Sequence, residues 1–325
     1  AKKLIENNSG PYFYLPKLEH YLECRLLNDV ISFCEKKLGF EIGTVKVTVL
    51  IETINAVFQM EEFLYELKDH IVGLNAGRWD YLFSYQKVYR NTKKVILPDR
   101  SKVNMFVPFM SNYNKLLVDT CHKRGAFGMG GMSAQVIAKA NPKEINEKAL
   151  VAVKKDKERE LNQGNDGAWV AHPSLVEPVK NIFEKNFKGL NQLNKFNNIK
   201  INRRDLLDEP KIDNAITEPG VRENLNEGII YLAFWIIGKG CSVVNYLMAD
   251  AATCEVSRAQ LWIWLKYKVK LDDGRIVDEK LIDELIKDEL NKIKKKFIVW
   301  KERTGDKSLD HVSFESAAKI FKEMI

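Results

Sequence analysis

The sequence predicts an α/β fold in which parallel strands alternate with helices, followed by a helical C-terminal part. First, two apolar runs, residues 45–52 and 70–80, flank a segment whose apolar residues recur at helical spacing. Such a strand–helix–strand unit lays parallel strands side by side. Second, several further strand and helix segments alternate along the chain, which is typical of a parallel sheet or barrel. Third, the pattern becomes helical and charged after about residue 256.

Six segments have the composition of core strands. They are residues 11–17, 45–52, 71–79, 125–131, 167–172 and 242–248. A seventh apolar run, residues 105–110, precedes a helical segment, and we expect it to be an excursion within a connection. Because a closed α/β barrel needs eight strands, we expect two strands to be missing before the first of these segments.

Helical segments separate the expected strands. The longest are residues 18–38, 143–164 and 221–240, the last of which is closed by a glycine. The polar stretch 191–214 predicts a loop inserted in the barrel part. We therefore expect a barrel domain over residues 1–255 and a helical domain over residues 256–325.

Composition indicates a soluble globular protein with one large domain and a smaller one. The chain has 325 residues, 45% of them hydrophobic and 29% charged. Its longest apolar stretch, residues 229–238, is too short to span a bilayer, and the N-terminal residues lack the features of a signal peptide. We therefore expect no membrane association. Five cysteines without a CxxC pair favour reduced thiols in a cytoplasmic setting and argue against a zinc site.

The charge distribution favours small anionic partners over nucleic acid. The net charge of +7 is mild for this length, and the one dense lysine run, residues 292–296, lacks interleaved aromatic residues. We interpret that run as a solvated helix face and expect no nucleic-acid partner. A general positive field favours an anionic small molecule or coenzyme A (CoA).

Two acidic residues, Glu52 and Asp80, each follow an apolar run and are separated by 28 positions. Because parallel strands end at the same edge of a sheet or barrel, we expect the two carboxylates to converge there. Two converging carboxylates form a suitable site for a hard divalent cation such as Mg²⁺. The alternative is that one or both cap the following helix.

Other candidates leave a structural interpretation open. His172 and Pro173 end an expected strand, where the histidine either contacts a ligand or forms a turn. We expect His70 and His122 to be packing or capping residues. The glycine-rich segment 125–132 indicates that its backbone comes close to a ligand or to another segment.

Longer motifs give the chain a specific resemblance. They are GPYFYLPKLE (10–19), TVLIET (48–53), HIVGLNAGRWDYLFS (70–84), LPDRSKVNMFVPFM (97–110), CHKRGAFGMGGM (121–132), DGAWVAHPSL (166–175) and LMADAATCEVSRAQLW (247–262). They occur in order over nearly the whole chain. The sequence resembles the malate synthase family, A-type isoform, whose members condense acetyl-CoA with glyoxylate to give malate and CoA in the glyoxylate cycle. The resemblance implies a TIM-type β8/α8 barrel, of which this chain would supply strands 3 to 8, and a C-terminal helical plug.

The resemblance also implies roles for individual residues. Glu52 and Asp80 would hold Mg²⁺, and Asp250 in LMADAAT would be the general base that takes a methyl proton from acetyl-CoA. The backbone from Gly77 to Asp80 would bind the glyoxylate carboxylate. The same resemblance places Trp79 at the wall of the glyoxylate pocket, whereas we expect Arg78 to brace the loop by an ion pair. His172 and Pro173 are candidates for contact with acetyl-CoA, with a structural turn as the alternative.

Two departures from the family pattern lead to alternatives. Residue 249 is alanine where the family has glutamate, and the family's PRGWH-like segment, with its arginine, does not occur in the sequence. We therefore expect the chain to lack the N-terminal part of a longer protein. The alternatives are a related Mg²⁺-dependent acyl-CoA lyase of the citrate-lyase-β or malyl-CoA type, and an inactive fragment with a structural or binding role. The sequence gives no prediction of oligomeric state.

Overall fold

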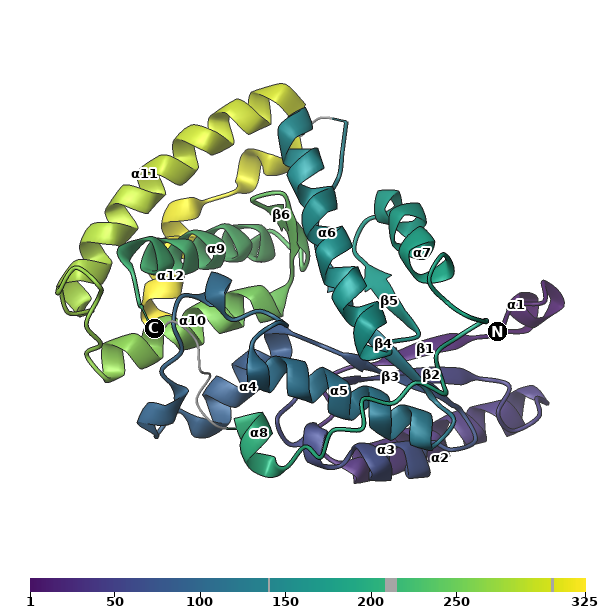
Figure 1. The fold of residues 1–325 in the computed structure, drawn as a ribbon. Coiled ribbons are helices and arrows are strands. Elements are labelled where there is room, and N and C mark those ends of the chain that lie inside the picture. Colours follow the sequence, from purple (N-terminus) through teal and green to yellow (C-terminus); the bar gives the residue numbers. More distant parts are fainter. Residues whose placement is uncertain (140, 208–214, 305–306) are drawn as a thin grey trace. The chain divides into compact units, whose positions relative to one another are not determined.

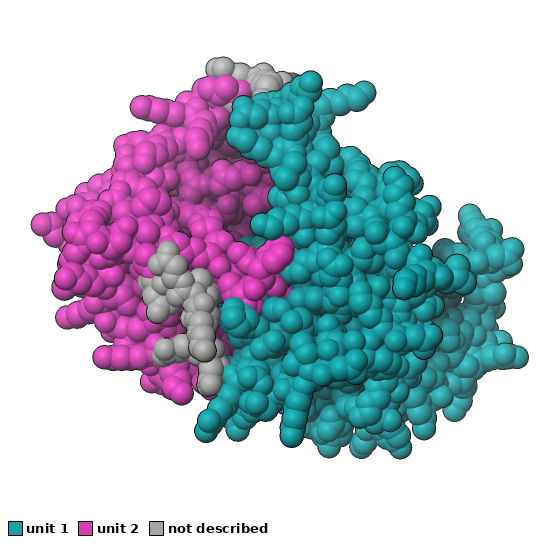
Figure 2. Space-filling model, viewed as in Figure 1, with its two compact units in different colours: residues 1–84, 108–207 teal, residues 85–107, 208–325 magenta. Residues whose placement is uncertain are grey.

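The structure is a computed structural model that describes residues 1–139, 141–207, 215–304 and 307–325. The chain forms two compact units, coloured separately in Figure 2. The first contains residues 1–84 and 108–207, and the second contains residues 85–107 and 208–325. This division differs from the expected boundary after residue 255, which stays a prediction.

The first unit is built on a parallel sheet, as expected. Its strands are β1 (Tyr12–Leu15), β2 (Lys46–Ile51), β3 (Ile71–Ala76), β4 (Phe127–Ser133) and β5 (Gly167–Val170). They lie side by side in sequence order, and every neighbouring pair is parallel (Figure 1). The sheet therefore has the α/β topology that the strand–helix alternation predicts.

One face of the sheet is apolar and packs under helices. In β2, Val47, Val49 and Ile51 are buried while the residues between them are half-buried, which is the alternation of a strand with two different faces. The helices and 3₁₀ turns of this unit are α1 (Lys2–Glu6), α2 (Tyr21–Leu38), η1 (Ala56–Phe58), α3 (Met60–Glu66), the first part of α4 (Trp79–Tyr89), α5 (Pro108–Lys123), α6 (Lys143–Gln163), η4 (Pro173–Leu175), α7 (Val176–Glu184) and α8 (Arg203–Leu207). Of these, α5 contacts β3 and β4, and α6 contacts β4.

The other face is concave. Tyr14 on β1 and Trp169 on β5 lie on the two edge strands, yet their ring centroids are only 4.2 Å apart. Strands in a flat sheet are spaced about 4.8 Å apart, so four strand spacings would separate these rings widely. The sheet is therefore strongly curled, as in half of a barrel.

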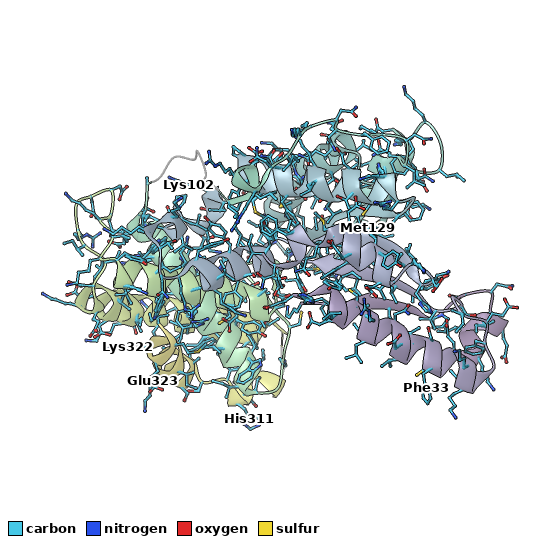
Figure 3. All side chains as sticks on the ribbon, turned by 90° about the horizontal axis from the view of Figure 1, so that it is seen from below. Phe33, Lys102, Met129, His311, Lys322 and Glu323 are labelled. Atoms are coloured by element: carbon cyan, nitrogen blue, oxygen red, sulfur yellow. The ribbon has the colours of Figure 1, made fainter. Side chains whose placement is uncertain are left out.

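The β1 edge and helix α2 expose apolar side chains. Tyr12 and Phe13 on β1 are 69% and 54% exposed. On α2, Leu22, Leu26, Val30 and Phe33 form an exposed stripe, from which Phe33 projects into solvent (Figure 3). An apolar stripe beside a sheet edge is a surface on which further chain or another protein can pair and pack.

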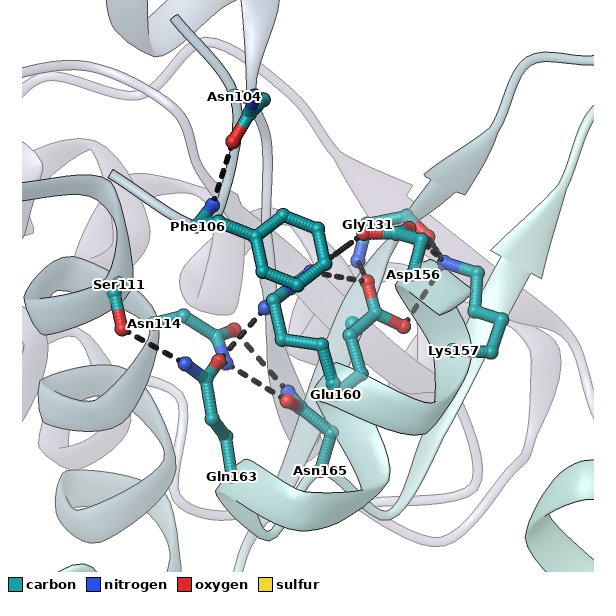
Figure 4. A network of polar contacts seen from close by, with 12 residues as sticks. Asn104, Phe106, Ser111, Asn114, Gly131, Asp156, Lys157, Glu160, Gln163 and Asn165 are labelled. Atoms are coloured by element: carbon teal, nitrogen blue, oxygen red, sulfur yellow. Dashed lines mark hydrogen bonds and ion pairs between the residues drawn. The ribbon is translucent and has the colours of Figure 1, made fainter. Parts of the chain in front are cut away.

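Helix α6 packs closely against the glycine-rich strand β4. A Cβ atom at Gly130 would lie 2.1 Å from the Glu160 carboxylate of α6. Glu160 is 1% exposed; it accepts from Gly131 N–H at 2.9 Å and from the buried Lys157 ammonium at 2.9 Å. Lys157 also donates to the Gly131 carbonyl at 2.7 Å (Figure 4). The glycines in this part of β4 therefore allow close contact with another segment, one of the two expected reasons for them.

The loop expected at residues 191–214 is ordered in its first part. Gln192 N–H donates to Asp166 Oδ1 at 2.7 Å, and Asn197 N–H donates to Asp119 Oδ1 at 2.9 Å. Residues 203–207 form α8, and residues 208–214 lie outside the described residues. Hydrogen bonds to Asp166, which precedes β5, and to Asp119 of α5 therefore hold the first residues of this loop in place.

The second unit is helical. It contains the end of α4, η2 (Lys93–Val95), η3 (Arg100–Lys102), α9 (Glu218–Ile236), α10 (Ala251–Lys266), α11 (Glu279–Thr304), η5 (Lys307–His311) and α12 (Phe314–Met324). Helix α9 contacts α10, α11 and α12, and its apolar side chains form much of the core of this unit. None of the described helices is both long and apolar enough to cross a membrane.

The prediction of a sixth core strand at residues 242–248 is wrong. This segment forms an antiparallel hairpin of β6 (Ser242–Val244) and β7 (Leu247–Ala249), and it belongs to the second unit. Asn245 and Tyr246, which connect the strands, have φ values of 48° and 65°. Two residues with positive φ are typical of the tight turn that reverses a chain. Among the described residues the parallel sheet thus has five strands, and the run 105–110 is not a strand, since α5 begins at Pro108.

His122 is a buried packing residue, as expected. Its ring nitrogens contact Asp166 Oδ2 at 2.8 Å and the Lys195 carbonyl at 2.7 Å. Burial opposes the charged imidazole, but these acceptors outweigh it and raise the pKa of His122.

The raised pKa of His122 predicts that the stability of the protein depends on pH. A raised histidine pKa stabilises the fold below the unfolded value of about 6.5, and this stabilisation is lost as pH rises through the folded pKa. We expect urea midpoints to fall between pH 6 and pH 9, and the fall to be smaller in His122→Gln. An equal fall in both proteins would contradict this role.

Candidate active site

The structure brings Glu52 and Asp80 together. Glu52 directly follows β2, whose last residue Ile51 pairs with Ala76 at the end of β3. Asp80 lies in the first turn of α4, which follows β3. Lys17 contacts both carboxyl groups, Glu52 through its backbone N–H and Asp80 through its ammonium, each at 2.6 Å. The expected convergence of these residues at the C-terminal edge of adjacent strands is therefore confirmed as geometry, while their role stays a prediction.

Gly77 makes this approach possible. A Cβ atom at residue 77 would lie 2.8 Å from Glu52 Cβ, closer than side-chain atoms approach one another. Any other residue would push the end of β3 away from Glu52. The glycine of the GRWD segment is therefore required by the packing of the acidic pair.

Lys17 is the basic partner of both carboxyl groups, and sequence reasoning missed it. Its backbone N–H donates to Glu52 Oε1 at 2.6 Å, and its ammonium donates to Asp80 Oδ1 at 2.6 Å. Lys17 has φ of 59°, in the left-handed region that non-glycine residues rarely adopt. The available signal was its position: Lys17 follows β1, and therefore lies at the same sheet edge as Glu52.

Glu52 and Asp80, the acidic pair, lie where negative charge is disfavoured. Glu52 is 1% exposed, whereas the side chain of Lys17 is 59% exposed. Burial and the neighbouring Asp80 charge raise the pKa of Glu52 to about 8, against the opposing effect of Lys17. Both effects oppose ionisation of Glu52, so a cation bound beside the two carboxyl groups would favour their ionised forms.

The expected substrate residues lie at the start of α4. Gly77, Arg78, Trp79 and Asp80 are all half-buried. The Arg78 guanidinium stacks on the Trp79 ring, 3.9 Å from the ring centroid. This stacking fixes the two side chains relative to each other. The expected ion pair of Arg78 and the contact of these residues with substrate stay predictions.

Asp250 belongs to the second unit, where it caps α10. Its carboxylate accepts a hydrogen bond from Thr253 N–H at 3.3 Å, and Thr253 completes a capping box. Asp250 is exposed, whereas the preceding Ala249 is 1% exposed. The capping bond uses Oδ1 and orients the carboxylate, so capping is compatible with a role in proton transfer.

His172 has a structural role in the described contacts. Its Nδ1 lies 2.7 Å from Ser174 Oγ and accepts from Ser174 N–H, so that it caps the short helix η4 that begins at Pro173. This is the turn interpretation of the two that the sequence left open. Contact of His172 and Pro173 with acetyl-CoA stays a prediction.

The arrangement of carboxyl groups, strand ends and capped helices can be compared with known proteins. The family described as "Malate synthase, TIM barrel domain" matches residues 1–209, and "Malate synthase, C-terminal" matches residues 215–325. The chain belongs to the malate synthase family.

Similar malate synthases are considerably longer than this chain. A protein of Candida tropicalis named "Malate synthase, glyoxysomal" is 49% identical over 284 residues, which cover 86% of this chain and 51% of that protein. A malate synthase of Myxococcus xanthus is 44% identical over 330 residues, covering 100% of this chain and 60% of its own length. The chain thus spans about half the length of the curated relatives that it matches.

A solved malate synthase shares the fold. The Haloferax volcanii malate synthase in a pyruvate and acetyl-CoA ternary complex superposes with a TM-score of 0.54 at 13% identity. The match covers 94% of this chain and 69% of that one. This likeness supports the TIM-barrel architecture to which the curled five-stranded sheet belongs.

The donor set of this malate synthase family member fits Mg²⁺. Among the described residues, no group of three or more His, Cys, Asp or Glu side chains is arranged to hold a metal ion. Mg²⁺ is commonly held by one or two carboxylates, with water and substrate completing its shell. The Glu52–Asp80 pair supplies two such ligands. One of them, Asp80, already accepts a hydrogen bond from the positively charged Lys17 ammonium.

Two tyrosines in the malate synthase site were also missed. Tyr14 donates to Asn75 Oδ1 at 2.9 Å, and Asn75 donates to the Gly130 carbonyl at 2.6 Å, so that the contacts link β1, β3 and β4. Burial raises the pKa of Tyr14, as do the nearby Glu52 and Asp80 charges, and the phenol therefore remains a proton donor. The signal for this link was Asn75, a polar residue inside an otherwise apolar strand.

Tyr113 of α5 holds the two strand ends together. Its hydroxyl donates to the Ile51 carbonyl and to the Gly77 carbonyl, the latter at 3.3 Å. Its ring stacks on Tyr81, with centroids 4.3 Å apart and planes 5° from parallel. Because Ile51 precedes Glu52, this contact positions the backbone from which the carboxylate projects. No feature of the sequence marks this contact, since Tyr113 lies within an ordinary amphipathic helix.

Proposed function

We propose that this chain carries the acidic metal site and the general base of a malate synthase, which condenses acetyl-CoA with glyoxylate to give malate and CoA. The observation that carries the proposal is the pair of carboxyl groups, Glu52 and Asp80, which Lys17 contacts at the C-terminal edge of β2 and β3. Membership of the malate synthase family supports the reaction type. The Haloferax volcanii relative, solved with pyruvate and acetyl-CoA, supports the substrate classes.

Glu52 and Asp80 would hold Mg²⁺, because they provide hard oxygen ligands at the same edge of the sheet. When bound, Mg²⁺ would supply Lewis-acid polarisation of the glyoxylate carbonyl. The first N–H groups of α4, an eleven-residue helix, would bind the glyoxylate carboxylate at the positive end of the helix. Arg78 and Trp79 would line this pocket through their stacked side chains.

Asp250 would take the proton from the methyl group of acetyl-CoA. This proton is weakly acidic, so a positioned carboxylate base is needed to generate the nucleophilic carbon. That carbon forms a bond with the aldehyde carbon of glyoxylate, and hydrolysis of the resulting thioester releases malate and CoA. His172 and Pro173 would contact acetyl-CoA. The cytoplasmic location stays a prediction, and the Candida tropicalis relative is named glyoxysomal.

A turnover experiment tests the proposed function. The protein is incubated with acetyl-CoA, glyoxylate and Mg²⁺, and free thiol and malate are both measured. We expect equal amounts of CoA and malate, and loss of both when a chelator removes Mg²⁺. A product that retains its thioester, with no free CoA, would instead indicate an acyl-CoA lyase. Absence of any product would indicate a fragment with a structural or binding role.

A further inference from the structure

Lys17 contacts the acidic pair through two groups with different freedom to move. Its backbone N–H is held by the chain and donates to Glu52 Oε1. Its ammonium reaches Asp80 Oδ1 at the end of a flexible side chain that is 59% exposed. The backbone contact can therefore persist when the ammonium moves into solvent.

We propose that the Lys17 ammonium is a built-in counter-cation of the Glu52–Asp80 pair, which a divalent cation displaces from Asp80 when it binds. This inference rests on the metal site proposed above. It assigns Lys17 as a positioning residue that holds the two carboxyl groups in place before the metal arrives.

The electrostatics favour such an exchange. Two neighbouring carboxylates repel each other when both are ionised, and Glu52 is almost fully buried. One ammonium neutralises half of this charge, and it contacts Asp80 Oδ1 at 2.6 Å. A divalent cation neutralises all of it and can bind both carboxylates directly. An exposed lysine loses little when it leaves such a pair, because water solvates its charge.

The backbone conformation of Lys17 indicates that the fold specifies where its N–H group and side chain point. Its φ of 59° is disfavoured for a residue with a side chain. This turn directs the N–H toward Glu52 and the side chain toward Asp80 at the same time. A lysine whose only role was solubility would not require this conformation.

Titration calorimetry with Mg²⁺ tests the exchange. Lys17→Met removes the ammonium but keeps the backbone N–H and the length of the side chain. We expect this variant to bind Mg²⁺ up to about fivefold more tightly than the parent, since an exposed ion pair no longer competes. The matched control is Lys123→Met, whose ammonium is 62% exposed and pairs with Glu61 at 3.0 Å away from the acidic pair. We expect its Mg²⁺ affinity to equal that of the parent.

Amine labelling gives a direct second measurement. In the parent protein, saturating Mg²⁺ should increase the acetylation of Lys17 by acetic anhydride, measured by mass spectrometry, and leave Lys123 unchanged. Unchanged or weaker Mg²⁺ binding in Lys17→Met, or protection of Lys17 by Mg²⁺, would overturn the proposal while leaving the metal site intact. Absence of Mg²⁺ binding in both parent and Lys17→Met would overturn the metal site and this inference together.

Discussion

Replacing Asp250 by asparagine is expected to lower the rate of condensation by about 10²- to 10⁴-fold, the usual contribution of general base catalysis. Asparagine has the shape of aspartate but cannot accept a proton at neutral pH. The structure adds a reason to expect the fold to survive, because Asp250 caps α10 and asparagine is an equally good cap. The rate should therefore fall without a change in the thermal unfolding midpoint.

Two further measurements separate proton transfer from packing. Exchange of the acetyl-CoA methyl protons with deuterated solvent, where the parent shows it, should disappear in Asp250→Asn. Asp278 is a matched control, since its Oδ1 accepts from Leu281 N–H at 2.8 Å at the start of α11. Asp278→Asn should retain the parental rate. Normal turnover in Asp250→Asn would show that the base lies elsewhere.

The fold of the first unit follows closely from sequence periodicity. The apolar runs 45–52 and 70–80 predicted β2 and β3, and the helical spacing between them predicted a helix. Parallel pairing then placed Glu52 and Asp80 at one edge. These features are local or follow from one topological rule. The curl of the sheet, by contrast, depends on contacts such as that between Tyr14 and Trp169, which are far apart in the sequence.

The hairpin in the second unit shows where periodicity fails. Residues 242–248 form a mostly apolar run, which predicts one strand, but the chain reverses at Asn245 and Tyr246. Asparagine tolerates positive φ and was a signal for a turn, whereas tyrosine at positive φ is unusual. The surrounding structure imposes this conformation, so composition alone does not predict it.

Partners of the site are harder to predict than its carboxyl groups. Lys17 and Tyr113 act through hydrogen bonds to residues 35 and 62 positions away. Both belong to segments whose composition is explained without them, one a strand end and the other a helix. A motif therefore locates the acidic residues, but three-dimensional contacts are needed to show what neutralises and positions them.

Replacing either acidic residue by alanine, in Glu52→Ala or Asp80→Ala, is expected to abolish Mg²⁺ binding. Each variant removes one of two hard anionic ligands, and mainly water then remains to hold the ion. Titration calorimetry with Mg²⁺ measures the effect directly, without relying on turnover.

The two variants should differ in stability, which provides an internal check. Glu52 is almost fully buried and accepts the Lys17 N–H, so its loss should lower the thermal unfolding midpoint more than the loss of the partly exposed Asp80. Glu62, which is exposed on α3, is the control: Glu62→Ala should bind Mg²⁺ as the parent does. Parental affinity in both Glu52→Ala and Asp80→Ala would place the metal elsewhere. Loss of binding in folded Asp80→Ala, in which the buried carboxylate is intact, would show that the ion needs both ligands.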